Sequence, residues 1–337
     1  MPQYQHDEEF TVMHYLIYFN STHSKLDGTW TAYCIITYIE LFCIFLSYLP
    51  VTFFGVLLFH HRLFHINLQN YMRSVVVEYL VQLTSRTAQI ILVFYSMEDS
   101  VYFYYASLAR CTCYFFVSLS LPAFVAERCG ASYFLSDYEK KSRHWMFIMN
   151  ISVNLVVSIF LSHEYHQVES TLILHIIMLI INGISSIIIY ILEKYNYNRL
   201  EDSSNLRKSL REYSLAERFQ ISENIRVFNL MKTIINVVAI FNLFQTGSAA
   251  MDNFEMNVTM LNIFATLFNI CVLSYGSLVF FLLYYLSPPM KDRLLGILRS
   301  FRIIRASTPN ENVKVKPLNL VAIESDQYFR QLQNQWT

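Results

Sequence analysis

The sequence predicts an all-α membrane protein. Of its 337 residues, 54% are hydrophobic and only 15% are charged, whereas soluble domains carry roughly a quarter charged residues. The deficit is concentrated in segments that contain no Asp, Glu, Lys or Arg, namely 145–162, 170–192, 233–251 and 256–290. About 20 apolar residues at a rise of 1.5 Å span the hydrocarbon core of a bilayer, so such segments are expected to cross it as helices.

Seven helical spans account for the apolar stretches along the chain. We expect them at about residues 31–58, 68–95, 101–127, 145–162, 171–192, 230–250 and 259–286. The second span carries Arg73, Glu78 and Arg86, but residues 87–95 are apolar and the stretch before them is amphipathic at helical period. A span with six neighbours can hold such polar groups on its inner face.

The basic residues predict which side of the membrane each end faces. With the N-terminus outside, the outer segments are 1–30, 96–100, 163–170 and 251–258. Their only basic residue is Lys25, and Lys and Arg concentrate on the cytoplasmic side of membrane proteins. The sequence therefore predicts an N-terminus outside and a C-terminus inside. Glycosylation sequons at Asn20 and Asn257 fall outside, whereas a third, at Asn150, falls in the fourth span; a glycan is expected at Asn20.

This interpretation divides the chain into four parts. Residues 1–30 form an extracellular N-terminus, and residues 31–286 form the seven-helix bundle. Residues 287–305 are expected to form a short amphipathic eighth helix along the inner leaflet, because an apolar stripe there is surrounded by basic side chains. Residues 306–337 are expected to be a disordered cytoplasmic tail. All six cysteines lie in or beside the spans, so no disulfide framework, metal site or cofactor is predicted.

An acid–base pair, Glu127–Arg128, ends the third span. In the predicted topology this pair lies on the cytoplasmic side. Seven spans, an outer N-terminus and an acid–arginine pair at this point resemble G-protein-coupled receptors. The resemblance implies that the arginine is held by its neighbouring acid and is freed when the helices spread to admit a G protein. The alternative is that the pair is only interfacial, since long charged side chains commonly reach water from the end of a span.

Two longer stretches resemble one receptor family more specifically. Residues 126–145 are AERCGASYFLSDYEKKSRHW, and residues 213–232 are YSLAERFQISENIRVFNLMK. They are similar to the nematode Sre, or epsilon, class of serpentine chemoreceptors. That class carries an A-E-R and a D-Y-E before span four and an E-R-[YF]-Q-x-x-E-N-I stretch before span six. The resemblance adds Glu223 and Asn224 to the expected coupling residues.

The resemblance implies a chemosensory receptor in the plasma membrane of nematode sensory neurons or their cilia. Its expected partners are an unidentified small-molecule ligand, a heterotrimeric G protein and the lipid bilayer. Nucleic acid is not expected, and association into homo- or hetero-oligomers stays open. The chain departs from rhodopsin-like receptors, because span three lacks a cysteine at its outer end, span six lacks a proline and span seven lacks Asn-Pro-x-x-Tyr.

Polar residues inside the spans are candidates for ligand binding. The candidate ligand set is Glu40, Glu78, Arg86, Arg110, Gln245 and Asn262. By helix rise, Glu40, Arg86 and Arg110 each lie about 13 Å below the outer boundary, and Glu78 lies about 12 Å deeper than Arg86. One carboxylate and two guanidiniums at one level suit an acidic or strongly polar ligand group. The alternative is that Glu40 and Arg86 neutralise each other and only hold two spans together.

Two other functions fit a seven-span protein. A ligand-gated channel like the insect odorant receptors has its N-terminus inside, against the distribution of basic residues here. Small transporters tend to have repeated halves and spans broken by Gly or Pro, but spans four to seven contain no proline. An enzyme is not expected, because the sequence has no H-E-x-x-H, no intramembrane Asp pair and no G-x-S-x-G motif.

Overall fold

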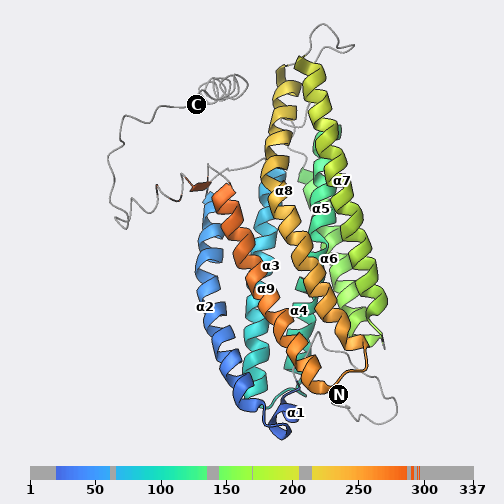
Figure 1. Cartoon of the computed structure of the whole chain (residues 1–337). Helices are drawn as coiled ribbons and strands as arrows, with labels where there is room; N and C mark the ends of the chain where they lie inside the picture. The colour runs from blue at the N-terminus through green and yellow to red at the C-terminus, as the bar shows by residue number, and fades with distance from the viewer. Residues whose placement is uncertain are drawn as a thin grey trace.

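Long helices run side by side along one axis in the computed structural model (Figure 1). The structure describes residues 20–60, 66–134, 144–168, 170–204 and 215–286, together with 290, 291, 294 and 296. Within these ranges every regular element is helical, and no strand occurs. The protein is therefore an all-α bundle, as the sequence predicts. Residues 1–19, the tail 306–337 and most of the expected eighth helix lie outside the described residues.

From α2 onward the helices alternate in direction, except that α5 continues the course of α4. Their bounds are α1 Ser21–Leu26, α2 Trp30–His60, α3 Ile66–Phe94, α4 Val101–Ser118, α5 Ser120–Tyr133, α6 His144–Gln167, α7 Leu172–Ser204, α8 Leu215–Ala250, the 3-10 turn η1 Met251–Asn253 and α9 Val258–Leu286. We call the end of the bundle that holds α1 the α1 end, and the end where α5 and α9 finish the far end (Figure 1). The fifth expected span ends at residue 192, but α7 continues to Ser204. The sixth expected span begins at residue 230, but α8 already begins at Leu215, so both helices are longer than expected at the far end.

Six helical segments in the described part are long and apolar enough to cross a membrane, judged by length and composition. They are α2, α4 with α5, α6, α7, the Lys232–Asn253 part of α8 with η1, and α9. The second expected span, α3, is not among them. Its helix is long, but its buried face carries many polar side chains among the apolar ones. Glu78, Gln82, Ser85 and Gln89 recur at helical spacing on that face, and all four are buried.

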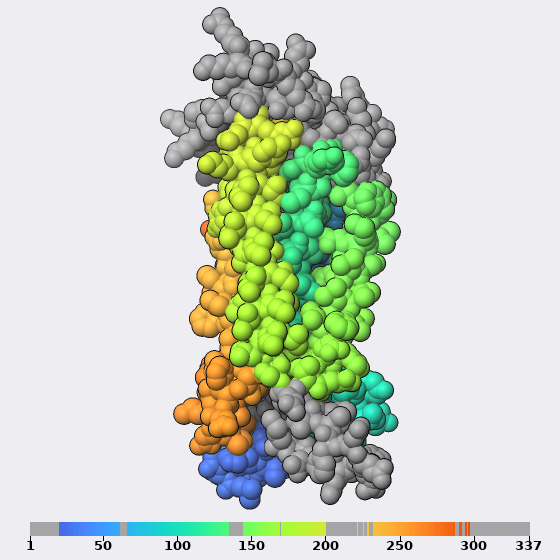
Figure 2. Space-filling model, turned by 90° about the vertical axis from the view of Figure 1, so that its right-hand side faces the viewer, coloured from blue at the N-terminus to red at the C-terminus, as the bar shows by residue number. Residues whose placement is uncertain are grey.

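The burial pattern of α6 is typical of a helix that contacts lipid. Its buried residues include Asn154, Ser158 and Ser162, whereas Val156 and Phe160 are exposed. The Ser162 hydroxyl donates to the Leu108 carbonyl of α4 at 3.0 Å. Small and polar side chains at helix contacts with apolar side chains outside are typical of membrane bundles. Figure 2 shows this face, with α5 visible between α6 and α7.

The third expected span, 101–127, is two helices rather than one. The interruption is confined to Leu119, between α4 and α5, and Val101–Tyr133 remains one candidate membrane-spanning segment. Pro122 explains the break, because proline has no N–H to donate to the Ser118 carbonyl and its ring crowds that carbonyl. The backbone N–H of Ala123 resumes the helical pattern by donating to the Leu119 carbonyl at 3.1 Å. α5 then continues to Tyr133, past the expected end of the span.

The centre of the bundle includes a close contact between α3 and α9. The Tyr79 ring packs directly on Gly276, where an added Cβ would lie 2.1 Å from the ring. The Tyr79 hydroxyl donates to the Leu273 carbonyl at 2.8 Å. Glycine at this point therefore makes room for the Tyr79 ring between α3 and α9.

Candidate functional site

The Glu40–Arg86 pair links α2 to α3. The Arg86 guanidinium donates from Nε to Glu40 Oε1 at 2.7 Å and from Nη2 to Glu40 Oε2 at 2.8 Å. Both side chains are largely buried, with 13% of Arg86 and 8% of Glu40 exposed. Two parallel hydrogen bonds of this kind are the strong form of an arginine–carboxylate contact. This geometry favours a structural role for the pair, which was the alternative left open by the sequence.

Arg110 of α4 lies fully buried, with 1% of its surface exposed. Its Nη1 donates to Gln89 Oε1 of α3 at 3.0 Å, and its Nη2 donates to Asn269 Oδ1 of α9. Its Nε is buried without a hydrogen-bond partner among the described residues. The Glu40 carboxylate attracts the Arg110 guanidinium and the Arg86 guanidinium repels it, so the two electrostatic effects oppose each other. The cluster therefore holds two guanidiniums and one carboxylate, and both oxygens of that carboxylate bind Arg86.

A set of aromatic and polar side chains lies next to Arg110, and sequence reasoning missed it. Phe268 of α9 packs under the Arg110 guanidinium at 5.4 Å and against the Tyr114 ring at 5.8 Å. The Tyr114 hydroxyl lies 3.4 Å from His175 Nδ1 of α7 and 3.3 Å from the Thr246 hydroxyl of α8. His175 is 1% exposed, and its Nε2 has no hydrogen-bond partner among the described residues.

Two signals in the sequence point to this set. Tyr114 follows Arg110 by four residues, so both lie on one face of the same helix. His175 is an ionisable residue in a span that contains no Asp, Glu, Lys or Arg. Looking only for Asp, Glu, Lys and Arg within the spans therefore misses His175.

Glu78 lies in a separate small cavity, not in the Arg110 cluster. By helix rise it is about 16 Å along α3 from Gln89, which binds Arg110. The cavity has a volume of about 20 Å³ and is lined by Glu78, Gln82, Gln245 and others. This is room for about one water molecule. Both carboxyl oxygens of Glu78 and Oε1 of Gln82 are buried without a hydrogen-bond partner in the described structure. The cavity thus brings two predicted ligand residues, Glu78 and Gln245, together away from Arg110.

Asn262, the last of the candidate ligand residues, holds the N-terminal segment instead. Its Oδ1 accepts a hydrogen bond from the Asn20 backbone N–H at 2.9 Å. The Asn20 side chain in turn caps α1 by accepting from the His23 N–H at 2.9 Å. Ser21 donates to the Glu98 carboxylate in the α3–α4 link. The start of the described chain is therefore tied across the α1 end of the bundle.

The Glu127–Arg128 pair lies in α5 at the far end. Arg128 Nε donates to Glu127 Oε2 at 2.5 Å, and Nη2 donates to Glu127 Oε1 at 2.6 Å. The pair is buried, with 6% of Glu127 and 2% of Arg128 exposed, so it is not a pair of side chains reaching into water. The Phe124 ring lies 6.0 Å from the Arg128 guanidinium. Glu223 and Asn224 lie in α8, and their side chains are outside the described structure.

Comparison with known proteins decides the family. The profile of the family described as "Sre G protein-coupled chemoreceptor" matches residues 1–337. The chain belongs to the Sre family. Serpentine receptor class epsilon-13 of Caenorhabditis elegans is 28% identical to it over 98% of this chain and 91% of that receptor. Serpentine receptor class epsilon-8 of the same organism is 26% identical over 94% of this chain and 95% of that receptor.

Membership of the Sre family confirms the family resemblance predicted from the sequence. Serpentine receptor class epsilon-45 of Caenorhabditis elegans shares 36% identity over a shorter region, 33% of this chain and 30% of that receptor. The protein is accordingly a multi-pass membrane receptor of the chemoreceptor type, and Sre is a receptor family rather than an enzyme family.

Proposed function

We propose that this Sre receptor binds a small molecule with an anionic group at Arg110 and signals through Glu127–Arg128 to a heterotrimeric G protein. The proposed ligand site rests on the burial of Arg110 and on the hydrogen-bond partners of its guanidinium. A fully buried guanidinium is costly unless a carboxylate or other acceptors match it. Arg110 has two amide oxygens and an unpartnered Nε, and the carboxylate of its cluster is bound to Arg86. A ligand carboxylate supplies the missing negative charge.

The neighbouring side chains support a ligand at this level. Phe268 packs against the Arg110 guanidinium and the Tyr114 ring, and Tyr114 in turn contacts His175, which has one unpartnered imidazole nitrogen. Pockets for small molecules are typically lined by aromatic groups with a few polar anchors. In our proposal Arg110 fixes the anionic group, and the rings of α4, α7 and α9 contact the remainder of the molecule.

The proposed signalling path follows α4 into α5. Arg110 lies on α4 and the Glu127–Arg128 pair lies on α5, with only the Leu119 turn between the two helices. A ligand that draws Arg110 away from Asn269 alters the contact of α4 with α9. Such a shift is a candidate means of separating Arg128 from Glu127. A guanidinium stays charged when partly desolvated, so it can exchange the acid for acceptors on a G protein.

The proposal requires seven crossings with the α1 end outside. Support comes from the basic residues, which are nearly absent from the links at the α1 end, and from the length of α3. Family membership supports, in addition, a place in the plasma membrane of sensory neurons or their cilia. Deglycosylation at Asn20, combined with antibody access to tags at both ends of the chain, tests the orientation. A protected N-terminus with an exposed C-terminus contradicts it.

A matched ligand panel tests the site. Cells expressing the receptor are exposed to small carboxylic acids and to their methyl esters, and G-protein activation is recorded. We expect acids to activate and their esters to fail, and we expect Arg110→Gln to remove the response while surface expression persists. Gln keeps an amide to bond Gln89 or Asn269 but has no charge. Ester responses equal to those of the acids, or acid responses that survive Arg110→Gln, contradict the proposal.

A further inference from the structure

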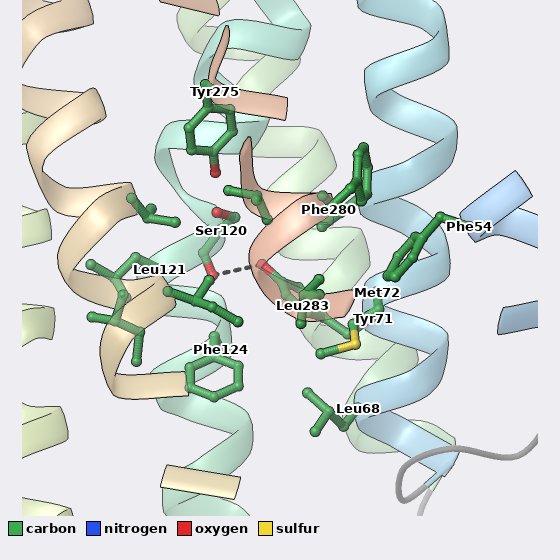
Figure 3. Close-up of a pocket in the computed structure, with 15 residues that line it drawn as sticks. Phe54, Leu68, Tyr71, Met72, Ser120, Leu121, Phe124, Tyr275, Phe280 and Leu283 are labelled. Atoms are coloured by element: carbon green, nitrogen blue, oxygen red, sulfur yellow. Dashed lines mark hydrogen bonds between the residues drawn. The ribbon is translucent and has the colours of Figure 1, made fainter. Parts of the chain in front are cut away.

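An apolar cavity lies between the helices, nearer than Arg110 to the far end of the bundle. Its volume is about 90 Å³, and Figure 3 shows side chains from α3, α5 and α9 around it. Met72, Phe124, Val238 and Leu283 line it from four different helices. All four are buried, so the walls of the cavity belong to the bundle interior, although the cavity is open on one side.

The cavity is lined almost entirely by apolar atoms. Its main polar contact is internal, because the Tyr71 hydroxyl donates to the Ser120 carbonyl at 2.6 Å (dashed line in Figure 3). None of its lining residues carries a buried polar side-chain atom without a hydrogen-bond partner. Apolar cavities of this kind stay dry and accept apolar guests; one of roughly 150 Å³ holds benzene or xenon.

We propose that this cavity is a second binding site, for a small uncharged apolar molecule that is smaller than benzene. Its volume is below that of a cavity that holds one benzene, so the cavity does not contain a whole lipid acyl chain or a sterol within its walls. Dispersion contacts with the surrounding side chains favour occupation, because the atoms that line an empty void lack partners on one side. The site differs in chemistry from Arg110, since it offers no charge.

Phe124 connects this cavity to the far end of the bundle. Its ring lines the cavity and also faces the Arg128 guanidinium at 6.0 Å. Ser120 and Leu121, which also line the cavity, belong to the turn of α5 that follows the Leu119 break. A guest molecule therefore packs between α5, α8 and α9 and holds them at their present spacing. We expect it to stabilise the arrangement in which Arg128 is paired with Glu127.

Xenon and three methionines test the site in the full receptor. The receptor is reconstituted in lipid nanodiscs with ¹³C-methyl methionine, and methyl signals are followed as xenon pressure rises. Met72 lines the cavity, Met178 is buried in a different cluster and Met149 is 57% exposed on the outside of α6. A Met72→Leu variant assigns the first signal. We expect a saturable shift of Met72, no saturable shift of Met178 and a linear response of Met149, which reports xenon in the lipid.

Cavity-filling variants supply the control. Val238→Phe places a ring in the cavity, whereas Val156→Phe makes the same change at a side chain that is 65% exposed on α6. We expect the saturable Met72 shift to disappear in the first variant and to persist in the second. Val279→Leu is a milder filling change, for use if Val238→Phe does not fold, and should weaken the shift. A linear or absent Met72 response, or one unaffected by filling, overturns the proposal. None of these readouts depends on a G protein or on Arg110, so failure here is distinct from failure of the proposed function.

Discussion

Arg86 of α3 holds both carboxylate oxygens of Glu40 on α2, at 2.7 and 2.8 Å. We predict that reversing the charge of either residue alone strongly destabilises the receptor. Glu40→Arg and Arg86→Glu each leave an uncompensated buried charge, which costs about 3–5 kcal/mol. The double variant restores opposite charges at the same two positions. Surface expression should be lost in each single variant and recovered in the double variant. Expression that stays normal in the singles contradicts a structural role for the pair.

Glu78, in contrast, is a buried acid whose carboxyl oxygens have no hydrogen-bond partner among the described residues. Replacing it by Gln supplies an N–H donor to a cavity whose unpartnered atoms are all oxygens, including Gln82 Oε1. Satisfying such groups is worth about 1–3 kcal/mol. We therefore predict that Glu78→Gln raises the thermal unfolding midpoint of the purified receptor. Gln82→Glu adds a second acid to the same cavity and should lower it. A lower midpoint for Glu78→Gln means that the acid has a partner that stabilises it.

Gly276 is predicted to be intolerant of any side chain. An alanine Cβ would meet the Tyr79 ring at 2.1 Å, and that ring is anchored by its hydroxyl to the Leu273 carbonyl. Overpacking of this kind typically costs 1–3 kcal/mol. Thermal unfolding of Gly276→Ala should show a lower midpoint, and adding Tyr79→Leu should relieve part of the loss. Gly183→Ala is the matched control, because nothing lies within 4 Å of its Cβ. A loss at Gly183 as large as at Gly276 shows that the ring contact is not the cause.

The Glu127–Arg128 pair yields a signalling prediction that rests on the proposed function. Glu127→Gln removes the charge that holds Arg128, so nucleotide exchange on a reconstituted G protein should rise several-fold without ligand. Arg128→Ala should abolish exchange, because it removes the group proposed to meet the G protein. Both variants need the same surface expression as wild type for the comparison. Unchanged basal exchange in Glu127→Gln places the switch elsewhere.

Hydropathy and charge were sufficient to predict the helical bundle, because a bilayer stabilises long apolar segments as helices whatever their tertiary contacts. The α4–α5 break was not predicted, although Pro122 was visible in the sequence. Proline near the start of a helix is well tolerated, so only the surrounding packing decides whether a proline bends a span or divides it. The short α1 helix was missed for a similar reason. Its Asn20 cap signal is weak, and its stability depends on contacts with residues far along the chain, such as Asn262.

The candidate site was predictable in its charges but not in its pairings. Helix rise placed Glu40, Arg86 and Arg110 at one depth, yet depth alone does not say which guanidinium takes the carboxylate. That choice depends on helix rotation, which turns Arg110 toward Gln89 and Asn269. Neither cavity has a signature in one sequence, because each is lined by residues from several helices.

The polar face of α3 bears on how the chain enters a membrane during synthesis. Arg73, Glu78 and Arg86 each oppose partition of an isolated helix into lipid, by roughly 2.5–3.5 kcal/mol for a charge at the centre of the span. α3 is therefore expected to insert poorly by itself. Its entry depends on α2, which supplies Glu40 to Arg86, and on α4, whose Arg110 bonds Gln89. Helices α2 to α4 would then leave the translocation channel as a cooperative group, and receptor yield in cells would be decided at that step.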